Sequence, residues 1–186
     1  MKFFIGLGGN CHITTLIERI QKRSEAYPFD YTITSFKGIV KLFSNNFEDF
    51  FNEEDFINSM NFDHKIKYMG DSSLFINNKY QVIFVHHRMK DKEEFEKNKI
   101  IFERRINRIK DKVNNPNNVI YFVRSKKITV GQSAKEHRIV LDEIWGKDFE
   151  ENVDEYKILK EKFNKIIKKY PAKCYLILPS EINKYS

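Results

Sequence analysis

The sequence places a cysteine directly after a glycine turn, where it can act as a nucleophile. Cys11 ends the segment Gly-Gly-Asn-Cys, which follows a short apolar run at residues 3–7. Apolar side chains then recur at helical spacing over residues 13–20, so we expect a strand, a turn and a helix that begins near Cys11. The N–H groups and dipole at a helix start lower a thiol pKa from about 8.5 towards 7. With Asn10 they can also hold an oxyanion. The alternative is a cysteine that only packs after the turn.

Two adjacent histidines follow a second apolar run and can supply a base. Residues 80–85 are rich in β-forming residues, and the run stops at His86 and His87. Side chains alternate along a strand, so at most one of the two imidazoles faces a given cleft. A neutral imidazole beside Cys11 can take the thiol proton and later return it. The alternative is a pair of surface histidines at a strand terminus.

Other polar residues can orient the histidine or bind a ligand. Asp30 lies in Pro-Phe-Asp-Tyr, where it either orients the imidazole or caps a turn. Arg104 and Arg108 lie one helical turn apart and can clamp a phosphate or carboxylate, although such arginines more often pair with acidic neighbours. Arg124 follows a third apolar run at residues 119–123.

Apolar runs that alternate with amphipathic helical segments predict an α/β fold: a mostly parallel sheet with helices on both faces. The expected strands lie near residues 3–7, 80–85, 119–123 and 174–178. The expected helices lie near residues 11–20, 92–113, 138–145 and 151–169. A helical insertion is expected over residues 36–62, after the first strand–helix unit, and a turn at residues 70–71. Ligands gather at the carboxyl ends of such strands, so the glycine turn, the histidine pair and Arg124 are expected on one edge. The length of 186 residues suits a single domain over residues 1–186.

The composition indicates the cellular compartment and the kinds of partner that we expect for the protein. The two cysteines, Cys11 and Cys174, form no disulfide framework, and no segment approaches the roughly 20 apolar residues that span a bilayer. We therefore expect a cytoplasmic protein without a membrane partner. The net charge is +7, but basic and acidic residues alternate, which favours solvated helix faces over a nucleic-acid surface. No metal-ligand spacing is found among the histidines, so no cofactor is expected; they are His12, His64, His86, His87 and His137.

Five motifs in chain order resemble those of a known family. They are Gly-Leu-Gly-Gly-Asn-Cys at 6–11, Pro-Phe-Asp-Tyr at 28–31, Phe-Val-His at 84–86, Phe-Glu-Arg-Arg-Ile-Asn-Arg at 102–108 and Phe-Val-Arg at 122–124. This series is similar to that of a family of papain-like cysteine peptidases, whose members carry Gly-x-Asn-Cys, Pro-Phe-Asp-Trp, Phe-x-His-Asp and Arg-Arg-x-x-Arg motifs and a closing Val-Arg. The resemblance spans residues 4–124.

The resemblance implies a nucleophile, a base and a third catalytic residue. These are Cys11, His86 and Asp30, respectively. It also implies a papain-like α+β fold, in which a catalytic helix precedes an antiparallel sheet, as the alternative to the parallel α/β fold. This chain has His87 where the family has Asp, and Tyr31 where it has Trp. The choice of base therefore stays open between His86 and His87.

The expected activity is that of a cysteine-nucleophile hydrolase, peptidase-like, or of an acyltransferase. The thiolate would attack an acyl or amide carbon of a peptide, acyl or glycan-type substrate. The alternative is a binding module without catalysis, which holds a phosphate-bearing or glycan ligand. The candidate ligand-binding residues are Gly8, Gly9, His87, Arg104, Arg108 and Arg124.

Overall fold

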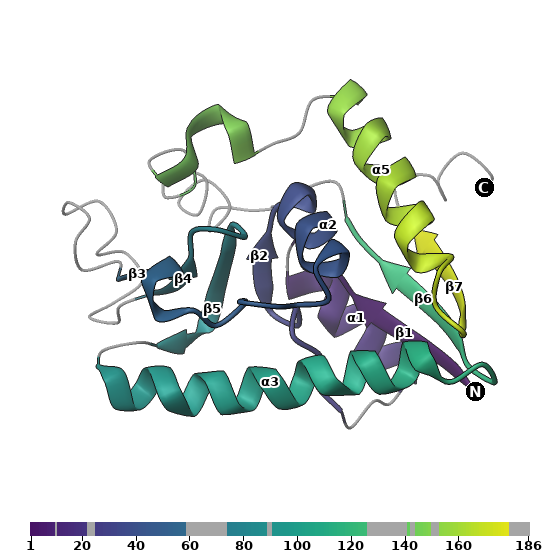
Figure 1. The fold of residues 1–186 in the computed structure, drawn as a ribbon, viewed down its shortest axis with the longest axis horizontal. Coiled ribbons are helices and arrows are strands. Elements are labelled where there is room, and N and C mark those ends of the chain that lie inside the picture. Colours follow the sequence, from purple (N-terminus) through teal and green to yellow (C-terminus); the bar gives the residue numbers. More distant parts are fainter. Residues whose placement is uncertain are drawn as a thin grey trace.

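The computed structural model describes most of the chain. The described residues are 1–9, 11–21, 25–58, 74–88, 91–125, 141, 144–149 and 153–178. The elements are β1 (Lys2–Gly6), α1 (Cys11–Gln21), β2 (Thr32–Thr34), α2 (Phe36–Ser44), η1 (Glu53–Asp55), β3 (Phe56–Asn58), β4 (Leu74–Asn77), β5 (Val82–Arg88), α3 (Lys92–Asn114), β6 (Val119–Val123), η4 (Gly146–Phe149), α5 (Val153–Ile167) and β7 (Lys173–Ile177) (Figure 1). The predicted turn at 70–71 and most of the predicted helix at 138–145 lie outside these ranges.

Three strands form a parallel sheet in the order β1-β6-β7. One face of this sheet packs against α1, where Val123 contacts Ile13 and Ile17. The other face packs into the main core with α2 and α5, where Phe122 meets the rings of Phe43 and Phe163. For these strands the predicted parallel sheet, covered by helices on both faces, is confirmed.

The remaining four described strands form an antiparallel sheet in the order β2-β5-β4-β3. The prediction that the strand at 80–85 joins the parallel sheet is therefore wrong, since β5 belongs to this second sheet. The run resembles a parallel strand because it is buried on both faces. Phe84 packs against α3, and Ile83 lies in a separate apolar cluster on the other side. The described strands thus form one parallel and one antiparallel sheet, so the α/β prediction is confirmed as a mixture of helices and sheets but not as one mostly parallel sheet.

The helical insertion predicted over residues 36–62 is confirmed only for α2. Ser35 caps that helix by accepting a hydrogen bond from a backbone N–H of its first turn. At its other end Asn46 and Phe47 have φ values of 55° and 62°, and this left-handed backbone ends the helix. The chain then forms turns and enters β3, so the phenylalanines that follow α2 reach the core from turns instead of from a second helix.

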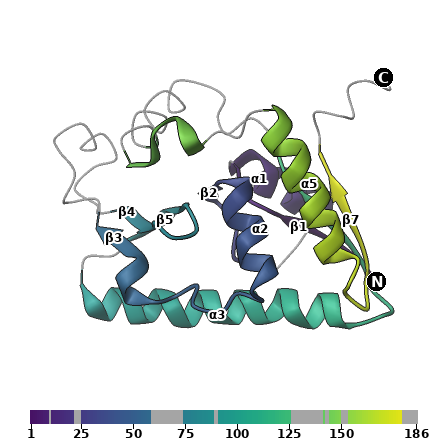
Figure 2. The ribbon, with the colours of Figure 1, turned by 45° about the horizontal axis from the view of Figure 1, so that its top comes forward.

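Helix α3 runs past both sheets along one side of the molecule (Figures 1 and 2). Its 23 residues extend about 35 Å at 1.5 Å per residue. Near its start Phe95 packs against Phe75 of β4, and near its end the Val113 carbonyl accepts a hydrogen bond from Ala172, just before β7. One apolar cluster includes residues of both sheets and of α3. This helix therefore sets the position of one sheet relative to the other.

The last residue of α1 occupies the outer edge of β1. The side-chain amide of Gln21 accepts a hydrogen bond from the Phe4 N–H at 3.2 Å and donates one to the Lys2 carbonyl at 3.4 Å. The side chain thereby pairs with β1 as a neighbouring strand would. This contact holds the C-terminal end of α1 against β1.

Replacing the N-cap of α3 should destabilise the fold. The Asp91 carboxylate accepts a hydrogen bond from the Glu94 N–H at 2.9 Å, so Asp91→Ala should lower the free energy of unfolding by about 1 kcal/mol. Urea unfolding measures this change. Asp111→Ala is the matched control, because an acid in the last turn opposes the helix dipole and its loss should leave stability unchanged or slightly raised. Equal losses in both variants would contradict the capping role.

Candidate active site

The turn between β1 and α1 places Cys11 at the first residue of a helix, as predicted. Gly8 and Gly9 have φ values of 69° and 97°, a left-handed backbone that suits glycine. A β-carbon on Gly8 would also collide with Thr34 Oγ1. The two glycines therefore make the turn and its close approach to β2 possible. Asn10 and the side chain of Cys11 lie outside the described residues, so their roles stay predictions.

Tyr31 connects α1 to the end of β5. Its backbone N–H donates a hydrogen bond to Thr14 Oγ1 at 3.1 Å, and its hydroxyl donates to Glu18 at 2.6 Å. The second bond raises the pKa of Tyr31 above its ordinary value. The Tyr31 ring meets the His86 ring edge-on, with 5.3 Å between centroids. The helix that begins at Cys11 and the strand that carries the histidines therefore share a neighbour.

A pocket of about 320 Å³ opens at this junction. The residues that line it are Ala26, Asp30, Tyr31, His86, His87 and Arg105. Three of the predicted site residues, Asp30, His86 and His87, thus lie around one cavity. Its volume falls within the range typical of small-molecule sites.

His87 is held in a defined orientation by α3. Its Nδ1 lies 3.0 Å from Asn98 Oδ1. This contact suits the tautomer in which Nδ1 carries the proton and Nε2 is an acceptor, because an amide oxygen only accepts. The ring also packs against Phe102, with 4.8 Å between centroids. Burial lowers the pKa of His87 below its ordinary 6.5, and the nearby charge of Arg105 acts in the same direction. His87 is therefore a neutral, oriented imidazole near pH 7.

His86 is the more exposed of the two histidines. Asp30 lies in the turn before β2 and lines the same pocket as His86. Asp30 is 2% exposed, and its Oδ2 accepts a hydrogen bond from the Tyr27 N–H at 2.6 Å. The carboxylate therefore makes the turn-capping contact considered from the sequence, while its orienting role stays a prediction.

The arginines of α3 differ in position. Arg104 is exposed. Arg108 donates a hydrogen bond to the Ala26 carbonyl at 2.8 Å, which ties α3 to one wall of the pocket. Arg105 lines the pocket itself, and its guanidinium lies 4.8 Å from the centroid of the Phe102 ring. Among the described residues, the arginine at the pocket is therefore Arg105 and neither of the two predicted ones.

Sequence reasoning missed Asn98 and Arg105. With Phe102 they follow the i, i+4, i+7 spacing of one helix face, and Asn98 is only 7% exposed. A polar residue within the buried stripe of an amphipathic helix is the signal that could have identified Asn98. For Arg105 the only sequence signal is its place on the same face.

Arg124 lies behind the glycine turn at residues 8–9, and it is 2% exposed. Its Nη1 donates to the Leu7 carbonyl at 2.9 Å and to Thr34 Oγ1 at 3.1 Å, and its Nη2 donates to the Thr34 carbonyl at 2.8 Å. The guanidinium also lies over the Phe36 ring, 5.1 Å from its centroid. These contacts hold the start of the glycine turn against the end of β2. The predicted role of Arg124 in ligand binding stays a prediction.

The structure thus has a cysteine at the first residue of a helix and, on β5, an imidazole whose Nδ1 faces an amide oxygen. Cysteine, histidine and asparagine are the residue types that cysteine-nucleophile hydrolases of the papain type use. The chain belongs to the family described as Putative papain-like cysteine peptidase (DUF1796), whose model matches residues 2–154. The resemblance inferred from the motifs is thereby confirmed. No curated protein and no solved structure matches the chain. The family description supports neither the acyltransferase nor the binding-module alternative.

Two features of the described residues bear on cofactors and membranes. In the described part of the chain, no group of three His, Cys, Asp or Glu side chains is arranged to hold a metal ion. The expectation that no cofactor is used stays a prediction. None of the helices in the described ranges has both the length and the apolar character needed to cross a membrane.

The lowered pKa of His87 should make stability depend on pH. Below pH 6.5 the unfolded chain takes up a proton at this residue more readily than the folded chain, so the wild type loses stability as the pH falls. His87→Gln removes this contribution. The wild type should therefore lose more free energy of unfolding than His87→Gln between pH 7.5 and pH 5, measured by urea unfolding. A difference between the two proteins that stays constant over this interval would show that folding does not shift the pKa of His87.

Proposed function

We propose that the protein is a cysteine-nucleophile hydrolase in which Cys11 attacks an amide or acyl carbon and His87 is its base. The observation that supports this most strongly is the His87–Asn98 contact, 3.0 Å long, in a pocket next to the helix that begins at Cys11. The contact leaves Nε2 free to accept a proton, which is what activation of a thiol requires. His86 has no comparable contact among the described residues, so we favour His87.

The proposed reaction has two halves. Nε2 of His87 accepts the thiol proton of Cys11, and the thiolate sulfur bonds to the carbonyl carbon of the substrate. The N–H groups of the first helical turn, which have no partner within the helix, stabilise the oxyanion. The imidazolium then returns the proton to the leaving amine as the C–N bond breaks. Finally His87 deprotonates a water molecule, which hydrolyses the thioester and releases the acid and the free thiol.

The other pocket residues suit a polar substrate of the peptide type. Arg105 and Asp30 bring charges of both signs to the pocket wall, and Tyr31 adds an aromatic surface. A peptide offers carboxylate, amide and ammonium groups that can pair with such a lining. In this scheme Asn98 and Arg124 are positioning residues, because the first orients the base and the second supports the turn before the nucleophile.

Iodoacetamide should label Cys11 well before Cys174 near pH 7. Burial raises the pKa of Cys174 to about 11, so that thiol stays protonated and unreactive, whereas Cys11 is activated by its helix and by His87. Peptide mapping of a labelling time course by mass spectrometry measures both rates. Cys11→Ala should remove the fast phase and any peptide hydrolysis, and Cys174→Ser should retain both. Equal, slow labelling of the two thiols would exclude an activated Cys11.

Asn98→Ala should slow the alkylation of Cys11 about tenfold near pH 6.5. The Asn98 contact raises the pKa of His87, so its loss makes the imidazole a weaker base and leaves less thiolate. The alkylation rates of Asn98→Ala and of the wild type should converge near pH 9, where the thiol ionises without a base. A variant that is only destabilised would not show this pH dependence. Asn114→Ala, at the exposed end of α3, is the matched control. His87→Gln should behave like Asn98→Ala, and if His86→Gln alone does so, His86 is the base.

A further inference from the structure

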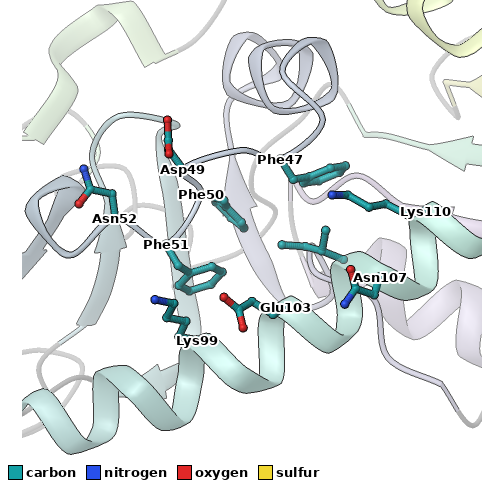
Figure 3. A pocket seen from close by; sticks show the side chains of 10 residues that line it. Phe47, Asp49, Phe50, Phe51, Asn52, Lys99, Glu103, Asn107 and Lys110 are labelled. Atoms are coloured by element: carbon teal, nitrogen blue, oxygen red, sulfur yellow. The ribbon is translucent and has the colours of Figure 1, made fainter.

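A second cavity, larger than the histidine pocket, lies between α3 and the turns that follow α2 (Figure 3). Its volume is about 560 Å³. The residues that line it are Phe47, Asp49, Phe50, Phe51, Asn52, Lys99, Glu103, Ile106, Asn107 and Lys110. We call it the α3 groove. Neither the family description nor the proposed hydrolase function assigns a role to it.

The α3 groove is separate from the histidine pocket, although both use α3 as a wall. Asn98 and Arg105 face the histidine pocket, whereas Lys99, Glu103 and Lys110 face the groove. Successive residues of a helix differ by about 100° around its axis, which directs neighbouring positions to different sides. A ligand in the groove therefore does not need to contact the histidines.

The floor of the groove is apolar and its ends are cationic. Phe50, Phe51 and Ile106 are buried beneath it. Lys99 and Lys110 are half-buried, and within the described ranges no ion pair joins either of them to another residue. Both ammonium groups can therefore pair with a carboxylate that a ligand supplies.

One carboxylate lies between the two lysines, and a second lies on the facing wall. Figure 3 shows Glu103 on α3 between Lys99 and Lys110, and Asp49 on the facing wall. Lys99 precedes Glu103 by four residues. An ion pair with the lysine first along the helix is weaker than one with the glutamate first. The charge along the groove is therefore positive at both ends and negative at the centre. A continuous polyanion such as a nucleic acid would meet these carboxylates, so this pattern disfavours it.

The facing wall is held in a defined conformation without a ligand. Asn46, Phe47 and Asp49 have φ values of 55°, 62° and 57°, which cost free energy in residues other than glycine. The Asn45 side-chain amide donates to the Glu48 carbonyl at 3.0 Å, which fixes these turns. A wall that is already ordered loses little conformational entropy when a ligand binds.

The length of the groove suits a short extended peptide. Lys99 and Lys110 are 11 positions apart (110 − 99), or about 16 Å along the helix. An extended chain covers about 3.3 Å per residue, so about five residues span this distance. The amides of Asn52 and Asn107 line the groove and can donate to and accept from a peptide backbone.

We propose that the α3 groove binds an extended peptide segment with acidic residues at both ends and a basic residue at its centre. The terminal carboxylates pair with Lys99 and Lys110, and the central cation pairs with Glu103. The side chains between them lie over the mostly buried rings of Phe47 and Phe51. This binding is independent of the hydrolase chemistry, since it requires neither Cys11 nor a histidine.

A charge-swapped variant tests the proposal. Fluorescence anisotropy, in the Cys11→Ala chain so that no probe is cleaved, compares labelled Asp-Leu-Lys-Leu-Asp with labelled Lys-Leu-Glu-Leu-Lys, both with blocked ends. The first peptide should bind about tenfold more tightly. The triple variant Lys99→Glu/Glu103→Lys/Lys110→Glu should reverse this preference. An unfolded or damaged protein loses binding but does not reverse it, so the reversal separates recognition from misfolding.

Lys162→Glu, on the exposed face of α5, is the matched control because it changes the net charge by the same amount as the triple variant. It should leave the preference as in the parent chain. The proposal is overturned if neither peptide binds, or if the triple variant and the control respond alike. It is also overturned if labelled oligothymidine binds better than the acidic peptide and the triple variant abolishes that binding. The triple variant can also be made in the chain that keeps Cys11. The rate of Cys11 alkylation in that chain should equal the rate in the wild type, so a failure of the peptide-binding proposal is distinguishable from a failure of the proposed hydrolase function.

Discussion

The buried guanidinium of Arg124 is the contact on which the site depends. It follows β6, and its hydrogen bonds reach Leu7 after β1 and Thr34 at the end of β2. One side chain thus joins the parallel sheet to the antiparallel sheet at the point where the glycine turn leaves for α1. Hydrogen bonds to charged groups are worth about 1.5–3 kcal/mol each, and buried carbonyls left without them would be penalised. The turn that places Cys11 is therefore supported from within the fold.

The two sheets contribute different parts of the site. The parallel sheet provides a strand end, a turn and a helix start, which are suited to hold a nucleophile and an oxyanion. The antiparallel sheet provides the imidazoles, and α3 provides the amide that orients one of them. Neither sheet contains the whole arrangement. The contacts of Arg124, Tyr31 and α3 set the two sheets against each other and thereby position both parts of the candidate site.

The parts that could be predicted from the sequence are local. The strand at 119–123 was expected with the same bounds as β6, and the glycine turn with a helix beginning near Cys11 was expected from spacing alone. Glycine conformation and helical periodicity act within a few residues, so a sequence window contains the information. One pocket is also lined by His86, His87 and Asp30, which were chosen as candidates from the sequence motifs.

The parts that could not be predicted depend on contacts between distant segments. A strand buried on both faces has the same composition in either kind of sheet, so the partner of β5 was not visible in its own residues. The contact between His87 and Asn98 joins a strand to a helix through tertiary packing. The contacts of Arg124 could not be predicted either, because its acceptors, at Leu7 and Thr34, are backbone and hydroxyl groups that carry no charge signal in the sequence.

The Gln21 amide that pairs with β1 has a consequence for assembly. An edge strand with free N–H and C=O groups can accept a further strand from a substrate or from another copy of the chain. At β1 those groups already contact a side chain from the helix of the same unit. A strand that added there would have to displace the end of α1, and with it the helix that begins at the cysteine. Sheet extension at β1 is therefore coupled to disruption of α1, so the Gln21 contacts disfavour strand addition on this side.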